Sequence, residues 1–122
     1  MHKKEEILRG QKAGVDTSIY ADSRYTSLQM HEIRLGLEQG LDVSWYTDQR
    51  FTPSQMGYIR EGLARGLDVS VYADPSCDEL RMKQILHKLM LNKDISMYIA
   101  DPNFKISRSE RYDFRDFDYN NH

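Results

Sequence analysis

Apolar and polar residues follow a helical period that restarts every 26 residues along this chain. One apolar stripe has spacings of three, four and four residues and consists of Met30, Ile33, Leu37 and Leu41. Its counterpart one period later consists of Met56, Ile59, Leu63 and Leu67. These spacings place each set on one face of an α-helix. The pattern therefore predicts two equivalent amphipathic helices.

The two helices belong to a longer repeat. Segments 26–48 and 52–74 are close copies, and looser copies lie at 7–22 and 78–101. One tyrosine stands at the same place in each copy: Tyr20, Tyr46, Tyr72 and Tyr98. A fixed period of this size is typical of architectures in which each unit buries its apolar face only by stacking on its neighbours.

We therefore expect an all-α fold of tandem 26-residue repeats, each a helix followed by a short helix, stacked as a small solenoid-like domain. Four units span residues 1–104 and end near residues 22, 48, 74 and 101, and residues 105–122 form a charged aromatic tail. Because the first unit begins close to Ile7 in this alignment, we expect it to lack most of the first half of its helix.

Helix boundaries follow from capping residues. Thr26 with Gln29, and Thr52 with Gln55, form capping boxes, and Asp78 takes the same position in the fourth unit. The helices are expected to end at Gly40, Gly66 and Asn92, because glycine and, less readily, asparagine adopt the left-handed conformation that closes a helix. A short helix or 3₁₀ turn follows, with Val43 and Tyr46 on its inner side in the second unit.

Two glycines, Gly36 and Gly62, lie inside the predicted helices. Glycine costs about 1 kcal/mol there relative to alanine. Its recurrence predicts that a neighbouring backbone passes close by, most simply the short helix of an adjacent repeat.

Composition narrows the classes of partner. The 122-residue chain has a formal net charge of −2, and residues 26–77 carry four arginines against seven acidic residues. A broad electrostatic attraction to nucleic acid or to an anionic membrane is therefore not expected. A single cysteine, Cys77, excludes an intramolecular disulfide framework and fits a reducing cytosol. The first ten residues lack the apolar core of a signal peptide, so we expect a cytoplasmic protein.

No motif of catalysis or of nucleotide binding is present. We therefore expect no enzymatic activity, no cofactor and no metal site. The recurring acids Asp16, Asp42, Asp68 and Asp94 are interpreted as caps of the short helices, and the serines two residues after each as structural hydrogen-bonding groups.

Three groups are candidates for contact with a partner. Asp22, Asp48 and Asp74 either form an acidic edge or serve the connecting turns. Arg34 and Arg60 either contact phosphates or a partner's acids, or pair with nearby carboxylates such as Glu38 at i+4 or an Asp of the next unit. The tail supplies four aromatic residues, Tyr112, Phe114, Phe117 and Tyr119. It is disordered, folds back over the last helix, or docks to a partner or to a second copy.

The string QMxxIRxGLxxGLDVSxYxD, at 29–48 and 55–74, resembles a short repeat of uncharacterised proteins from Firmicutes and their plasmids, conjugative elements and phages. The resemblance implies a bacterial or mobile-element origin and a binding role, for which an inhibitor of a host defence nuclease, such as an anti-CRISPR protein, is a specific form. From the repeats we expect a module that binds a protein partner. The alternative is a nucleic-acid-binding protein that uses Arg34, Arg60, Arg65 and the basic fourth helix, with Arg81, Lys83 and Lys88.

Overall fold

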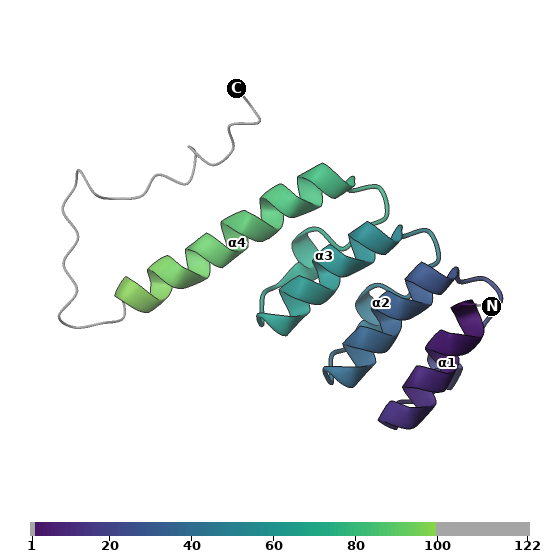
Figure 1. Ribbon diagram of the computed structural model, residues 1–122. Coiled ribbons are helices and arrows are strands. Elements are labelled where there is room, and N and C mark those ends of the chain that lie inside the picture. The colour runs from purple at the N-terminus through teal and green to yellow at the C-terminus, as the bar shows by residue number, and fades with distance from the viewer. Residues whose placement is uncertain (1, 100–122) are drawn as a thin grey trace.

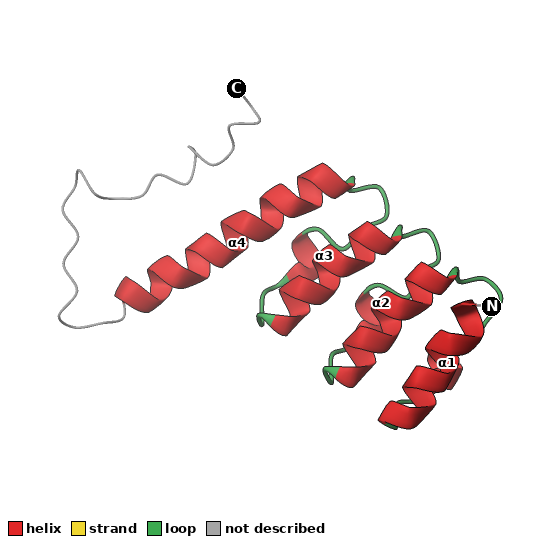
Figure 2. Ribbon diagram, viewed as in Figure 1, coloured by secondary structure: helices red, strands yellow, loops and turns green. Residues whose placement is uncertain are grey.

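The computed structural model describes residues 2–99, and side chains through residue 93. The elements in chain order are α1 (His2–Ala13), η1 (Thr17–Ile19), α2 (Ser27–Glu38), η2 (Val43–Trp45), α3 (Pro53–Ala64), η3 (Val69–Val71) and α4 (Glu79–Ile99), where η denotes a 3₁₀ helix. Over residues 2–99 there is no β-strand (Figure 2), which confirms the all-α prediction. The tail, with Tyr112, Phe114, Phe117 and Tyr119, lies outside the described residues.

The four α-helices lie side by side in chain order (Figure 1), and each packs against the next one along the chain. Each of α1, α2 and α3 also packs against the short helix that follows it. The capping boxes predicted at Thr26 and Thr52 are both present, with Pro53 at the start of α3. Asp78 likewise accepts a hydrogen bond from the backbone N–H of Arg81, at 2.8 Å.

The recurring tyrosines join each short helix to its own α-helix. Tyr20, Tyr46 and Tyr72 are at most 1% exposed. Each hydroxyl donates to a backbone carbonyl 14 residues earlier, at 2.6 Å for Glu6, 2.8 Å for Glu32 and 2.7 Å for Tyr58. Because a buried hydroxyl without a partner is costly, this hydrogen bond allows the whole ring to enter the core.

The helix glycines make room for these tyrosines. A Cβ at Gly36 would lie 2.0 Å from the Tyr46 hydroxyl oxygen and 2.7 Å from Cγ1 of Val43. The expectation that a backbone of an adjacent repeat approaches Gly36 is therefore wrong, because the close neighbours are side chains of the same unit. Gly10 and Gly62 have equivalent surroundings.

Helices α2 and α3 end as predicted, at Gly40 and Gly66, and the fourth helix does not end at its predicted position. Gly14, Gly40 and Gly66 have φ between 72° and 80°, which terminates α1, α2 and α3. At the fourth position the chain has Asn92, and α4 continues through it to Ile99. Asparagine adopts the right-handed helical conformation far more readily than the left-handed one. The short helix expected around Tyr98 is therefore replaced by a longer α4, while the side chains of Asp94 and Tyr98 lie outside the described part.

The first unit is not shortened. Helix α1 has 12 residues, as do α2 and α3. The prediction that this helix lacks most of its first half is wrong. Polar residues stand there at the positions where the other units have the apolar residues of the repeat pattern. Lys4, for example, takes the position of the buried Met30 and Met56, and is exposed.

Candidate functional site

Two buried glutamines connect each unit to the next connector. Gln29 is 6% exposed, and its Oε1 accepts from the backbone N–H of Thr26 at 2.9 Å. Its Nε2 donates to the carbonyls of Gln49 and Phe51, at 3.0 and 2.8 Å. The side chain therefore caps α2 and holds the connector before α3 at the same time.

Gln55 repeats this arrangement. Its Nε2 donates to the carbonyls of Pro75 and Cys77, at 3.1 and 2.8 Å. The sequence analysis recognised both glutamines as caps but missed their second role. Their amide was the available signal, because glutamate also completes a capping box and only glutamine can donate.

The central arginines serve contacts between units. Nε of Arg34 donates to Oε1 of Glu6 at 2.8 Å, and its Nη1 pairs with Glu38 four residues later. Nε of Arg60 donates to Oε1 of Glu32 at 2.9 Å. Pairing with nearby carboxylates is thus confirmed, although the partner from another unit is a glutamate of the preceding unit rather than an aspartate of the next.

This ladder of ion pairs ends at the third interface. The positions equivalent to Glu32 and Arg60 hold Tyr58 and Leu86. Leu86 belongs to the apolar core, and the partly buried Tyr58 packs against that core. Arg34 is only 7% exposed, so its guanidinium is not accessible to a phosphate. Arg65 is more exposed and lies 3.3 Å from Glu61 on the same helix.

The Glu6–Arg34 pair also affects titration. Burial by itself raises the pKa of Glu6, but the hydrogen bond and positive charge of Arg34 outweigh it, and the pKa is lowered. His31, at 3.4 Å, acts in the same direction. The carboxylate is therefore held in its charged form at the interface between α1 and α2.

The second row of aspartates forms the connecting turns. Oδ1 of Asp22 and Oδ1 of Asp48 each accept a backbone N–H two residues later at 2.9 Å, and Oδ1 of Asp74 does so at 2.8 Å. These hydrogen bonds within the turns account for the aspartate at each position, so no binding partner is needed to explain it. Asp48 also pairs with Arg50 at 2.7 Å, which neutralises part of the proposed acidic edge. A role of these three acids in binding stays a prediction.

Three of the four aspartates expected to cap short helices do so, namely Asp16, Asp42 and Asp68. The expected cap at Asp94 is wrong, because α4 runs through this residue and no short helix begins there. Oδ1 of Asp16, Asp42 and Asp68 accepts the backbone N–H of the serine two residues later, at 3.1 Å in each unit. The serine hydroxyl donates to the same oxygen, at 2.5 Å in the first two units. All three aspartates are nevertheless exposed.

Other chemistry is sparse in the described part of the chain. Burial raises the pKa of the Cys77 thiol, which disfavours the nucleophilic thiolate. Among residues 2–99, no group of three or more His, Cys, Asp or Glu is arranged to hold a metal ion. No helix in that range has both the length and the apolar character needed to cross a membrane.

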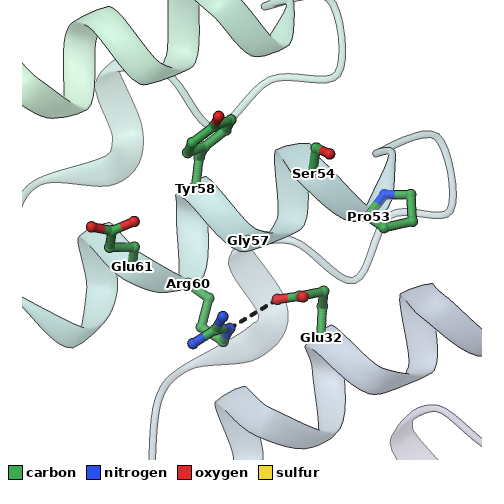
Figure 3. Close-up of a pocket in the computed structure, with 7 residues that line it drawn as sticks. All are labelled: Glu32, Pro53, Ser54, Gly57, Tyr58, Arg60 and Glu61. Carbon is green, nitrogen blue, oxygen red and sulfur yellow. Dashed lines mark hydrogen bonds and ion pairs between the residues drawn. The ribbon is translucent and has the colours of Figure 1, made fainter.

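An open hollow of about 350 Å³ lies beside Gly57, between α2 and α3. Figure 3 shows that Arg60 and Glu32 point toward one another, whereas Tyr58 lies on the other side of the α3 ribbon. The polar groups around the hollow therefore do not converge on one point, as binding of a small molecule requires.

A row of exposed apolar residues runs along the short helices. Ile19, Trp45 and Val71 occupy equivalent positions in three successive units and are 39%, 42% and 55% exposed. The sequence analysis did not select them. The signal was present in the unit pattern, because the residue before each core tyrosine is apolar in all three units. We call the surface of η1, η2 and η3 that carries this row the short-helix face.

Comparison of the chain with protein-family models, with characterised proteins and with solved structures finds no match.

Proposed function

We propose that the repeats form a small solenoid-like stack that binds another protein through its short-helix face. The observation that carries this proposal is the row of Ile19, Trp45 and Val71, apolar residues that recur at one position and remain exposed. Tryptophan at the centre of such a row is the side chain most often found to dominate the energy of a protein interface.

The other polar side chains of the repeats make contacts within the fold, and this supports the same proposal. Gln29 and Gln55 hold connectors, and Arg34 and Arg60 hold neighbouring helices. Within the described residues, every buried side-chain nitrogen and oxygen has a hydrogen-bond partner. These groups are thus accounted for by packing, whereas the apolar row is not.

Binding of nucleic acid is less well supported. Of the arginines on which it depends, Arg34 is buried in an ion pair and Arg60 is paired with Glu32. We expect no binding of single- or double-stranded DNA or RNA at physiological salt. A complex whose affinity falls steeply between low and physiological salt would favour this alternative instead, because phosphate contacts release counterions.

Affinity capture from cells that naturally produce the chain tests the proposed function. The wild type is compared with Trp45→Ser and with Leu80→Ser, whose leucine is 64% exposed on α4, outside the row. We expect a defined protein to be retained by the wild type and by Leu80→Ser, and lost with Trp45→Ser. Retention of the same proteins by all three baits would refute binding through this face, and recovery of no defined protein would refute the function.

The narrower form is an inhibitor from a mobile element that presents its acidic central repeats to the basic groove of a host defence nuclease. Its support is the excess of acids over arginines in residues 26–77 and the sequence resemblance. Charge reversal of Asp48 and Asp74 would also remove the caps of two turns, so asparagine at both positions is the better test. Unchanged inhibition of the captured nuclease by that double variant would contradict the acidic-face mechanism.

A further inference from the structure

The short-helix face repeats one local structure in three successive units. Ile19, Trp45 and Val71 each follow the second residue of a 3₁₀ helix whose cap, serine and tyrosine make the same hydrogen bonds in every unit. Neighbouring packed α-helices lie about 8–10 Å apart. Because each short helix packs against one of these helices, we expect the apolar side chains of the row to lie at intervals of roughly 8–10 Å.

This interval matches one type of extended chain. A polyproline II segment has three residues per turn and a rise of about 3.1 Å per residue, which gives about 9 Å per turn. Every third side chain of such a segment points in the same direction. A single extended segment can therefore place one side chain against each unit. On one face of an α-helix, side chains recur about 5.4 Å apart after one turn and about 10.8 Å apart after two turns, and neither value lies within this interval.

The aspartates that cap the short helices indicate the charge that a bound segment should carry. Asp16, Asp42 and Asp68 stand three residues before the apolar positions and are exposed, although each uses Oδ1 to cap its short helix. The hydrogen bonds of Ser70 lower the pKa of Asp68, which keeps this carboxylate charged. A negative row beside an apolar row is complementary to a segment that carries apolar and basic side chains with the same period.

We propose that the partner contributes an extended segment in the polyproline II conformation, with an apolar residue at every third position and a lysine or arginine beside it. Its apolar residues contact Ile19, Trp45 and Val71, and its cations face Asp16, Asp42 and Asp68. This inference rests on the proposed function and specifies the partner for the same face.

Trp45 is the only tryptophan of the chain, so its fluorescence reports on the row directly. The probe is a 12-residue peptide of four Leu-Pro-Lys repeats, titrated into the full chain. Matched peptides carry Leu-Pro-Glu, or Leu-Pro-Pro-Lys, which changes the period from three to four. We expect a saturable shift of the emission to shorter wavelength with Leu-Pro-Lys, and neither matched peptide to reproduce it.

Variants of the chain separate the two rows. Asp42→Asn with Asp68→Asn keeps both caps, because asparagine caps as well as aspartate. Loss of two exposed ion pairs is expected to weaken binding by roughly two- to tenfold. Val71→Ser is expected to weaken it by about tenfold, the value of one buried valine side chain. Equal binding of the Leu-Pro-Glu peptide, or no effect of the double asparagine variant, would overturn the assignment of charge.

Two other occupants have distinct outcomes. If emission moves to shorter wavelength with rising protein concentration alone, a second copy covers the row, and the proposal fails. If replacing Tyr112, Phe114, Phe117 and Tyr119 by serine in the full chain moves it to longer wavelength, the tail of the chain covers the row, and the proposal also fails. Capture of a protein through Trp45 without binding of any Leu-Pro-Lys peptide would overturn the extended segment and leave the proposed function standing.

Discussion

Replacing Gly62 by alanine tests the contact between the short helix and the α-helix of one unit. Alanine in a helix interior normally gains about 1 kcal/mol over glycine. At Gly62, however, the new Cβ would lie 2.2 Å from the Tyr72 hydroxyl oxygen and 2.7 Å from Cγ1 of Val69. Both neighbours belong to η3 and its cap, and the hydroxyl is held by the carbonyl of Tyr58. We therefore expect Tyr72 to be displaced.

The magnitude follows from three contributions. Overpacking a core by one methyl group costs about 1–3 kcal/mol. Loss of the Tyr72 hydrogen bond costs about 1 kcal/mol more, and the helix gains about 1 kcal/mol from alanine. Gly62→Ala is therefore expected to lower the free energy of unfolding by about 1–3 kcal/mol.

Gly57 supplies a control in the same helix. A Cβ there would meet only the carboxylate of Glu32, at 3.5 Å and beyond, which is ordinary contact. Gly57→Ala should accordingly raise the free energy of unfolding by about 0.5–1 kcal/mol. Urea denaturation followed by far-ultraviolet circular dichroism measures both variants. The substitutions therefore have opposite signs on one helix.

A second background isolates the hydroxyl. In Tyr72→Phe the next nearest tyrosine atom to the new Cβ, Cζ, lies 3.4 Å away, while Val69 remains close. Gly62→Ala should then cost less in Tyr72→Phe than in the wild type, a coupling that a double-mutant cycle measures. The reasoning is refuted if Gly62→Ala is as stable as Gly57→Ala, or if its cost is the same in both backgrounds.

Three further predictions concern the contacts between units and the tail. Gln55→Glu keeps the acceptor of the capping box but leaves the carbonyls of Pro75 and Cys77 without their donor, so urea denaturation should show that the free energy of unfolding falls by about 1–3 kcal/mol. Gln49→Glu, at an exposed position of a connector, should show little change. Because folding lowers the pKa of Glu6, its contribution to stability is complete above its ordinary pKa of 4.5 and is lost as the pH falls through the lower folded value. Glu6→Gln should therefore remove this part of the pH dependence of the unfolding free energy, and leave its slope with pH unchanged outside that acid range. Deleting residues 108–122 should lower the melting temperature, as expected of a tail that covers the last helix, and an unchanged melting temperature would contradict that role.

Features set by neighbouring residues were predictable from the sequence. The capping boxes at Thr26 and Thr52, the turn at Asp42 and the left-handed Gly40 each depend on residues within about four positions. Repetition of the pattern added the expectation that Tyr46 is buried, because one position holds tyrosine in every unit. Local chemistry and the 26-residue period together were enough for most element boundaries of the second and third units.

Features set by packing were not predictable in the same way. The partner of Arg34 is Glu6, 28 residues earlier, and its choice depends on how α1 lies against α2. The period showed that Gly36 faces something close but did not identify Tyr46. At Asn92 the period predicted a helix end, yet asparagine does not enforce one, and α4 continues. The exposed row was overlooked because apolar residues were assigned to the core. Most core residues are apolar, but not every apolar residue lies in the core.

Fluorine NMR of the chain labelled with 5-fluorotryptophan tests the central claim most directly. Trp45 gives a single resonance, because the chain has one tryptophan and an unlabelled partner contributes none. Addition of the protein captured from the producing cells is predicted to shift or broaden that resonance in proportion to the complex formed. An unchanged resonance at saturation, with the complex verified by sedimentation, would contradict binding through the short-helix face.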